Sequence, residues 1–343
     1  MRPLLSLGIP TFNRAPYLDR LLSSLLEDVK QLTDKDFELL VRDNASTDNT
    51  TEVCERYAKL IPGFKYIRSP ENEGAYKNGT AVQKTMSGQW IWMSGDDDFF
   101  KVGTILKLIN EIKKDKCDII LLNRSQCDRD EAMVTESVIE GLGDCYFERL
   151  GGFASIPCSY EMIGFLGSAL YKRDFIDTQD LGVYNLPSFF NHVSIIFETF
   201  GNRPMKYFAE PLMTQRLFNI RGGSAVDTTI DVSLKTGFSL LSELLLVQAR
   251  EKMPAEELWA WSMRRAYGKS GGSISLLEWT INYLIKGPLM QGFGQIPDAD
   301  YDMMFKFLTE NGRGLPPAAY QTIYASFAAA VDGLKARRAL ITA

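Results

Sequence analysis

The sequence predicts an α/β fold, a mostly parallel sheet flanked by helices, with a helical C-terminal region. Over the first 125 residues, short apolar runs alternate with longer segments of helical periodicity, a pattern typical of βαβ units. After about residue 234 the helical periodicity continues without strand-like runs. We therefore expect a regular α/β half over residues 1–125, a less regular half over 126–233 and a helical region over 234–343.

The first two strands are expected at Leu4–Ile9, which ends in the turn PTFNR, and at Phe37–Arg42. Between them, Tyr17–Val29 carries leucines three and four residues apart, which predicts a helix with one apolar face. The polar run DNASTDNTT at Asp43–Thr51 offers N-caps for a second helix, which we expect to continue through Leu60.

Lys65–Arg68 predicts a third strand, followed by a glycine-containing loop and a helix near Gly79–Met86. Gln89–Ser94 is a fourth strand whose composition indicates burial on both faces. A helix over Val102–Lys114 and a strand over Asp118–Asn123 complete the regular part.

The segment that follows, residues 129–159, is irregular and rich in turn residues. Beyond it, Gly164–Phe175 predicts a returning strand and the start of a helix.

Composition excludes several classes of protein. Lys and Arg number 38 against 43 Asp and Glu, a net charge of -5, so we expect no nucleic-acid partner. The single histidine, His192, excludes metal sites that need two imidazoles. Five cysteines without a CxxC pair indicate neither a disulfide framework nor a zinc site, which favours a reducing cytoplasm.

The sequence predicts neither a signal peptide nor a membrane span, because the first apolar run is short and is broken by Pro10. Peripheral membrane contact is a separate hypothesis. Ser273–Ile285 has the composition of an amphipathic surface helix, which would lie either on lipid or on the protein's own core.

Three consecutive carboxylates, Asp96, Asp97 and Asp98, follow the fourth strand. Burial and like charge both disfavour their ionisation, so a positive group is expected among them. In an extended backbone Asp96 and Asp98 would project to the same side, where a divalent cation such as Mn²⁺ or Mg²⁺ could bind their oxygens. The alternative is that these residues cap the next helix or are solvated in a turn.

The surrounding loops favour the ligand-binding interpretation. PTFNR, DNAS and NEG each follow a strand of the same predicted sheet, and ligands bind beyond the carboxyl ends of parallel strands. The chain has neither GxGxxG after the first strand nor a GxxxxGK[ST] phosphate loop. Metal and basic side chains would therefore neutralise a bound diphosphate.

These motifs, in this order, resemble the family 2 glycosyltransferases with the glycosyltransferase A-type fold. The matching segments are LSLGIPTFNR, FELLVRDNASTDNT, NEGAYKNG and GQWIWMSGDDD, and GSALYKRDF is similar to the subset that includes abequosyltransferases. The resemblance implies a Rossmann-like fold in which residues 1–125 bind a nucleotide sugar and residues 126–233 face the acceptor.

The resemblance also implies roles for single residues. Pro10, Thr11 and Phe12 would flank the base and ribose, Asp43 would accept a hydrogen bond from the base, and Asp96–Asp98 would hold ribose and the diphosphate-bound metal. A carboxylate accepts only, so Asp43 selects an imide N–H such as that of uracil, which favours a UDP-sugar; capping together with Ser46 is its alternative role. The remaining candidates for the nucleotide sugar are Arg14, Asn72, Gly74 and Arg221.

The general base is the least defined part of this site. The acidic pair that many relatives carry is absent between residues 177 and 200, where His192 and Asp180 are the candidates and Asp177 and Glu198 their rivals. Packing at a helix start is the alternative for His192. Further on, QRLFNIRGGS joins Arg216 and Arg221 to a Gly-Gly pair, which suits a loop closing over a diphosphate.

The expected function is metal-dependent, inverting transfer of a sugar from a nucleoside-diphosphate sugar to a hydroxyl of a glycan or lipid-linked acceptor. The resemblance places this reaction in surface polysaccharide assembly, in the cytoplasm or at the inner face of the membrane. The alternatives are a nucleotidyltransferase and a catalytically silent protein that binds sugar nucleotides or glycans.

Overall fold

The computed structural model describes residues 2–154, 162–177 and 191–217, together with the single residues 321, 325 and 328. Its chain divides into two compact units. The first contains residues 1–153, 161–181 and 199–222, and the second contains residues 154–160, 182–198 and 223–343. The expected division at residues 125 and 233 stays a prediction, since the helical region lies outside the described residues apart from three single positions.

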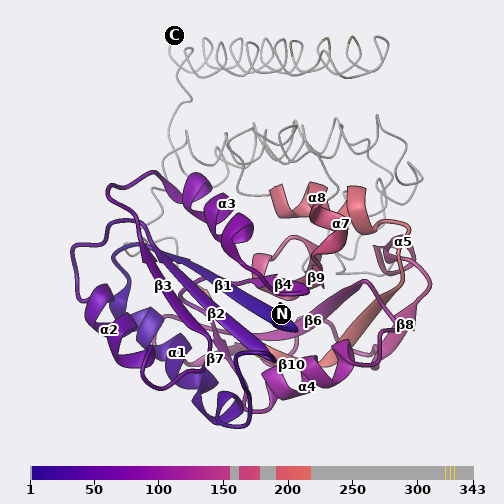
Figure 1. Cartoon of the computed structure of the whole chain (residues 1–343). Coiled ribbons are helices and arrows are strands. Elements are labelled where there is room, and N and C mark those ends of the chain that lie inside the picture. The colour runs from indigo at the N-terminus through magenta and orange to yellow at the C-terminus, as the bar shows by residue number, and fades with distance from the viewer. Residues whose placement is uncertain are drawn as a thin grey trace. The chain divides into compact units, whose positions relative to one another are not determined.

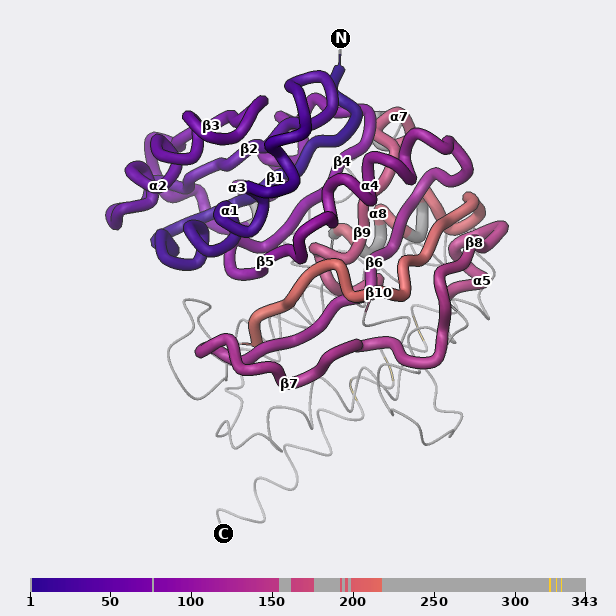
Figure 2. The backbone as a smooth tube through the Cα atoms, turned by 90° about the horizontal axis from the view of Figure 1, so that it is seen from below, coloured from indigo at the N-terminus to yellow at the C-terminus, as the bar shows by residue number. Residues whose placement is uncertain are grey.

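The first unit is built on one sheet, to which all ten strands of the described chain belong. These strands are β1 (Leu5–Thr11), β2 (Phe37–Asp43), β3 (Phe64–Arg68), β4 (Trp90–Met93), β5 (Phe99–Phe100), β6 (Ile119–Cys127), β7 (Met133–Thr135), β8 (Cys145–Phe147), β9 (Ala169–Lys172) and β10 (Met205–Arg216). Their order is β3-β2-β1-β4-β9-β6-β10-β5, with β7 beside β6 and β8 beside β10 (Figure 2).

The sheet is mixed, with parallel pairing through its regular half. β3, β2, β1 and β4 pair in parallel, as do β6 and β10, whereas β9 runs antiparallel between β4 and β6. The predicted mostly parallel sheet is therefore confirmed. Because β1 to β4 run in the same direction, their carboxyl ends meet at one edge of the sheet.

Helices flank the sheet on both faces, with α1, α2 and α4 on one side and α3 on the other (Figure 1). Their bounds are α1 (Ala15–Val29), α2 (Thr50–Tyr57), α3 (Ala75–Thr85), α4 (Thr104–Ile112), α5 (Leu150–Ala154), the 3-10 turn η1 (Leu166–Ser168), α7 (Asp174–Asp177) and α8 (Asn191–Phe200). On the α3 side, Gly8 permits a close approach, since a Cβ there would lie 2.4 Å from Val82.

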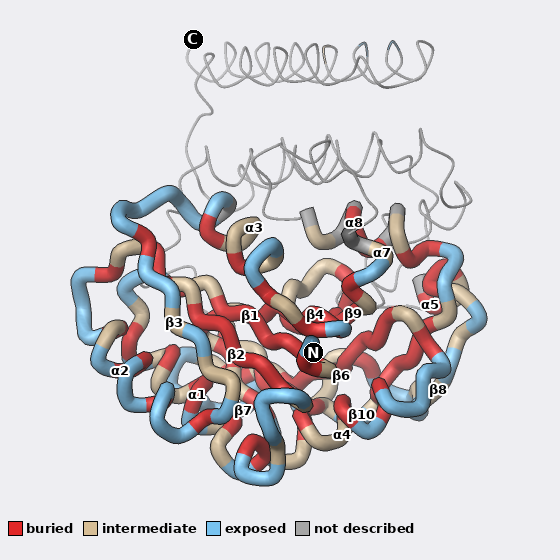
Figure 3. Tube along the Cα trace, in the orientation of Figure 1, coloured by how far each residue is buried: buried red, intermediate tan, exposed pale blue. Residues whose placement is uncertain are grey.

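The core lies between the sheet and α1, α2 and α4, and the central strands are its most buried part (Figure 3). Alternate residues of β1 point into it, and the leucine face of α1 covers them. Trp92 of β4 packs against Phe100 with ring centroids 4.8 Å apart. Its indole N–H donates to the carbonyl of Gly167 at 2.7 Å, which satisfies a polar atom that would otherwise be buried without a partner.

The helix boundaries differ most from the sequence predictions in α2 and α3. α2 ends at Tyr57, and Leu60 is 53% exposed instead of continuing the apolar face. Pro62 and Gly63 follow, and Gly63 has a positive φ of 68°, which ends the helical path. α3 begins at Ala75, one turn before the expected start, because Gly74 with φ 85° makes the turn that leads into it.

The segment over residues 129–159 is more regular than predicted. β7, β8 and α5 lie within it, and β7 and β8 pair with the longer β6 and β10. Strands this short carry little periodicity of their own, so only their partners define them. Among the described helices, none combines the length and apolarity needed to cross a membrane.

Candidate functional site

Four loops meet at the carboxyl edge of the sheet, following β1, β2, β3 and β4. The first two are joined directly. The backbone N–H of Asn13 donates to the hydroxyl of Ser46 at 2.9 Å, and the backbone N–H of Thr47 donates to Oδ1 of Asn13 at 2.7 Å. Asn13 and Ala45 have positive φ values of 53° and 65°, so both loops adopt turns that side chains ordinarily avoid.

The third loop is attached to the second through asparagine side chains. Nδ2 of Asn44 donates to Oδ1 of Asn72 at 2.7 Å, while Oδ1 of Asn44 accepts the N–H of Glu73 at 2.9 Å. Asn72 also accepts the N–H of Gly74 at 2.9 Å. The predicted residues Asn72 and Gly74 are therefore brought to the DNAS loop, and both are exposed.

The first loop also reaches the acidic triplet after β4. The hydroxyl of Thr11 donates to Oδ2 of Asp96 at 2.7 Å, although the two residues are 85 apart in the sequence. Nη1 of Arg14 lies 2.9 Å from Asp96 and 2.9 Å from Asp97. Arg14 therefore supplies the positive charge that we expect among these carboxylates.

Asp98 has different partners. Its Oδ1 accepts the backbone N–H of Arg216, at the end of β10, at 3.2 Å. The expected extended backbone through the triplet is wrong, since the chain bends at Asp96 and Asp97 after β4 has ended. Gly95 permits this bend, because a Cβ there would lie 2.8 Å from Oδ1 of Asp97 and 3.3 Å from Oδ2 of Asp98.

Burial raises the pKa of two of these carboxyl groups. The pKa of Asp96 rises to about 6, mainly because the group is buried, and Asp97 adds to this while Arg14 opposes it. The pKa of Asp98 rises well above its ordinary value, again through burial first and then through the charge of Asp97. Burial and the neighbouring carboxylate thus both disfavour ionisation of Asp96 and Asp98.

Two buried carboxylates suit a hard divalent cation, although in the part of the chain that the structure describes no group of three or more His, Cys, Asp and Glu side chains is arranged to hold one. Asp96 and Asp98 are 5% and 3% exposed, and their carboxylate oxygens are the ligand type that Mg²⁺ and Mn²⁺ prefer. Among the described residues, Asp98 accepts one hydrogen bond, which leaves lone pairs on its oxygens for a metal.

Asp43 holds the loop that follows it. Its side chain is fully buried, with Oδ1 accepting the N–H of Ser46 at 2.8 Å and Oδ2 accepting the hydroxyl of Tyr66 at 2.9 Å. Nε of Arg68 lies 3.4 Å from Oδ2. Asp43 therefore closes the turn to Ser46, whereas the alternative role of helix capping is wrong, because α2 begins only at Thr50. Recognition of a base by Asp43 stays a prediction.

The remaining predicted residues are distributed differently. Pro10 is half-buried in β1, and Phe12 is 36% exposed beside the loops just described. His192 lies in α8, in a stretch that belongs to the second compact unit. Asp180 and Arg221 lie outside the described residues. The structure brings the loops after β1 to β4 together, while binding of a nucleotide sugar by their residues and the choice of base stay predictions.

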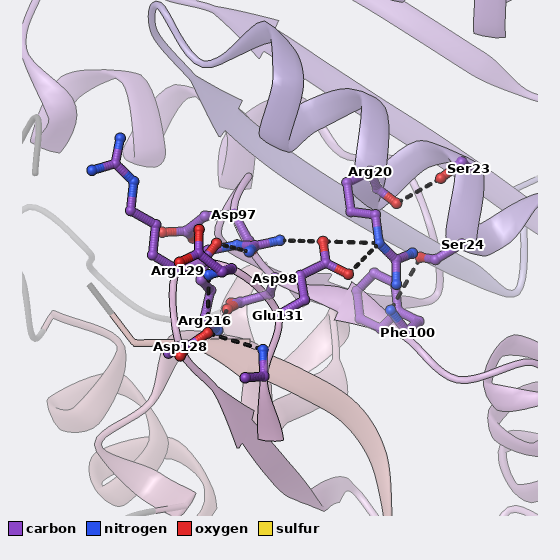
Figure 4. A network of polar contacts seen from close by, with 12 residues as sticks. Arg20, Ser23, Ser24, Asp97, Asp98, Phe100, Asp128, Arg129, Glu131 and Arg216 are labelled. Carbon is purple, nitrogen blue, oxygen red and sulfur yellow. Dashed lines mark hydrogen bonds and ion pairs between the residues drawn. The ribbon is translucent and has the colours of Figure 1, made fainter. Parts of the chain in front are cut away.

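Glu131 and Arg20 were not anticipated from the sequence as residues near the acidic triplet. Glu131, in the turn between β6 and β7, contacts Arg216 and Arg20, as Figure 4 shows. The turn sequence DRDE reads as a solvated charged loop, and no periodicity links it to the triplet. Only the pairing of β6 with β10 brings it there.

Similarity to solved structures identifies the class of fold. The chain resembles residues 1–349 of Staphylococcus aureus TarS, solved in complex with UDP-GlcNAc, with a TM-score of 0.64 at 13% identity. The superposition covers 96% of this chain and 88% of the TarS chain. At this identity the likeness shows the fold alone, which is the glycosyltransferase A-type fold predicted from the sequence.

The sequence of the regular half is similar to a known family. Residues 6–142 match the Glycosyl transferase family 2 model. This part of the chain is therefore similar to glycosyl transferase family 2, and it contains β1 to β6 and the contacts of the acidic triplet with the first loop.

Curated proteins similar to this chain are named as glycosyltransferases. Abequosyltransferase RfbV of Salmonella typhimurium is 28% identical over 237 residues, which cover 62% of this chain and 66% of RfbV. Validoxylamine A glucosyltransferase of Streptomyces hygroscopicus is 49% identical over 65 residues, 19% of this chain and 15% of that protein. The chain spans just under two thirds of RfbV and a much smaller share of the second relative.

Proposed function

We propose that this protein transfers a sugar from a nucleoside-diphosphate sugar, with a UDP-sugar as donor, to a hydroxyl of a glycan or lipid-linked acceptor. The observation that carries the proposal is the joining of four loops around buried, charge-rich Asp96 and Asp98. The match of residues 6–142 to the glycosyl transferase family 2 model and the likeness to a UDP-GlcNAc complex of TarS support it. Inversion at the anomeric carbon, Mn²⁺ or Mg²⁺ dependence and a role in surface polysaccharide assembly are parts of the same proposal.

Different residues of these loops would hold the base and the diphosphate of the donor. Phe12 offers an exposed ring for the base, and Arg68, whose side chain is 45% exposed beside Asp43, offers donors to its edge. The diphosphate would lie near Asp96–Asp98 and Arg14. Since no glycine-rich phosphate loop is present in the sequence, cationic groups must neutralise its charge.

Asp96 and Asp98 are the residues that would hold the metal. A bound divalent cation would supply Lewis-acid stabilisation of the departing nucleoside diphosphate. Arg14 keeps Asp96 and Asp97 in place before the cation arrives, because its guanidinium contacts both. Thr11 restricts Asp96 further through its hydroxyl. These contacts preorganise the site, so less freedom is lost on binding.

Sugar transfer also requires a base that takes a proton from the acceptor hydroxyl. We propose His192 for this role, with Asp180 as the alternative, since the ordinary pKa of an imidazole suits proton transfer at neutral pH. Arg221 would join the closed donor site. For a lipid-linked acceptor, the reaction would take place in the cytoplasm at the inner face of the membrane, with peripheral contact.

Thermal unfolding with nucleotides tests the donor part of this proposal. UDP, TDP, GDP and CDP are each added with and without Mn²⁺, and we expect UDP with Mn²⁺ to raise Tm most. Failure of all four to raise Tm would contradict the proposal. Equal stabilisation without metal would contradict the role assigned to Asp96 and Asp98.

Hydrolysis of the donor separates an enzyme from a silent binding protein. Without an acceptor, wild type is expected to hydrolyse a UDP-sugar slowly. With an acceptor, it is expected to transfer the sugar faster. His192→Ala should lose transfer and still bind UDP. Release of pyrophosphate from a nucleoside triphosphate would instead favour the nucleotidyltransferase alternative.

A further inference from the structure

Glu131 stands out because its backbone adopts a left-handed conformation, with φ 65°. A glutamate pays a conformational cost there, which the surrounding turn must offset. Oδ1 of Asp128 does so by accepting the N–H groups of Asp130 and Ala132, each at 2.9 Å. The turn between β6 and β7 thus fixes the position from which the Glu131 side chain extends.

The carboxylate of Glu131 bridges two arginines from distant parts of the chain (Figure 4). Both of its oxygens lie within 3.1 Å of Nε of Arg20 on α1, and Oε1 accepts from Nη2 of Arg216 at 2.7 Å. The separations in sequence are 111 and 85 residues. The bridge therefore ties α1 and the end of β10 to one turn.

The two guanidinium groups also share an aromatic neighbour, Phe99, which directly follows the acidic triplet. Arg20 lies 4.0 Å from the centre of this ring and Arg216 lies 5.7 Å from it. Two like charges around one ring repel each other. Glu131 supplies the negative charge between them that makes this arrangement favourable.

Arg216 in turn contacts the triplet through its backbone N–H and its side-chain Nε. Its backbone N–H donates to Asp98 at 3.2 Å and its Nε donates to the carbonyl of Asp97 at 3.3 Å. Nη1 donates to the carbonyl of Arg129 at 2.7 Å. With 4% of its side chain exposed, Arg216 is held by the protein on all sides.

We propose that Glu131 is a positioning residue for the donor site: by locking Arg216 against Arg20 and Phe99, it holds Asp97 and Asp98 in the geometry that binds the nucleoside diphosphate and its metal. This inference rests on the proposed function for its ligand. Glu131 itself contacts neither reacting group. Its effect passes through Arg216 to the triplet.

Hydrogen exchange tests the positioning step without any ligand. In Glu131→Ala, the amide of Arg216, followed in the peptide over residues 212–217, is expected to exchange about tenfold faster than in wild type, because the strand end is released. Glu131→Gly accommodates the positive φ but lacks the carboxylate, so it should behave like Glu131→Ala. Glu131→Gln, which keeps an acceptor oxygen, should recover part of the protection.

Calorimetric titration with UDP and Mn²⁺ tests the consequence for the ligand. Glu131→Ala is expected to bind about 10 to 100-fold more weakly, as for other groups that orient metal ligands. Glu27→Ala is the matched control, since it removes a 2.6 Å ion pair with Lys30 on the same helix as Arg20 and should change neither measurement.

Unchanged exchange at Arg216 in Glu131→Ala, or wild-type behaviour of Glu131→Gly, would overturn the positioning role. Unchanged affinity for UDP with Mn²⁺ in a folded Glu131→Ala would overturn its connection to the donor. A wild type that binds no nucleoside diphosphate would refute the proposed function instead, and the exchange experiment would still decide whether Glu131 positions Arg216.

Discussion

Nη1 of Arg14 lies 2.9 Å from Oδ1 of Asp96 and 2.9 Å from Oδ2 of Asp97. One guanidinium nitrogen therefore joins two neighbouring carboxylates at the start of α1. The contact links the loop after β1 to the triplet after β4. Arg14 is 82 residues from Asp96 and 83 residues from Asp97 in the sequence. The contact explains how buried carboxylates can stand side by side before any metal binds.

Replacement of Arg14 should therefore affect both stability and binding. We expect Arg14→Ala to lower the free energy of unfolding by about 2 to 4 kcal/mol, because it leaves buried carboxylates without their counter-charge. Arg14→Lys should restore only part of this, since an ammonium lacks the planar fork of a guanidinium. Urea unfolding measures the change, with Lys30→Ala, an exposed ion-pair variant, as control. Equal stability of Arg14→Ala and Lys30→Ala would contradict the pairing.

Asp98→Asn tests the proposed metal site with little change in the shape of the side chain. Loss of the carboxylate charge should reduce transfer by at least about 100-fold and abolish the stabilisation by Mn²⁺, whereas wild type treated with EDTA should resemble the variant. Donor turnover and thermal unfolding are measured on the same samples. Undiminished turnover of wild type in EDTA would exclude the proposed metal dependence.

The raised pKa of Asp96 predicts how stability depends on pH without ligand. Between its ordinary pKa of 3.8 and about 6, the folded state binds a proton that the unfolded state has released. The free energy of unfolding therefore falls as pH rises through this window, by up to about 3 kcal/mol. Asp96→Asn lacks this titration, so its stability relative to wild type should increase between pH 4 and pH 7.

Urea unfolding of both proteins across this range provides the measurement. The two chains share every other titratable group. Because the charge of Asp96 also raises the pKa of Asp98, the difference between their curves reports the titration of Asp96 together with its effect on Asp98. Curves that stay parallel would show that Asp96 is not held in the buried environment described.

Gly95→Ala probes the bend in the triplet. A Cβ would lie 2.8 Å from Oδ1 of Asp97, so this carboxylate must move and its contact with Arg14 should weaken. We expect about tenfold weaker binding of UDP with Mn²⁺ at a modest cost in stability, about 1 kcal/mol. Calorimetric titration checks this. Gly143→Ala is the control, because a Cβ there would meet nothing within 4 Å.

Asp28 allows the packing of the fold to be tested separately from the candidate site. Its buried carboxylate accepts the N–H of Gly103 at 2.5 Å and that of Ile105 at 2.7 Å, which caps α4 from α1. Asp28→Ala should lower the free energy of unfolding by about 1 to 2 kcal/mol and leave the affinity for UDP unchanged. A large loss of affinity would mean that the packing of α1 on α4 controls the donor loops.

The sequence determined the regular half of the fold because its elements carry strong local signals. The leucine periodicity of α1 and the apolar runs of β1, β2 and β4 define both the elements and their order. Since parallel strands place their carboxyl ends together, it also predicted that PTFNR, DNAS, NEG and the acidic triplet would meet. The elements, their order and the meeting of these loops depend on periodicity and residue type, and both can be read from the sequence.

Tertiary structure alone decided which groups make contact within the site. Arg14 at the triplet, Tyr66 on Asp43 and Glu131 between Arg20 and Arg216 are pairings across 23 to 111 residues. No local pattern specifies them, because each depends on strand order and on the bend at Asp96. The sequence therefore determined that a charged site forms at this edge, and the packing of β10, α1 and the β6–β7 turn decided how its charges are balanced.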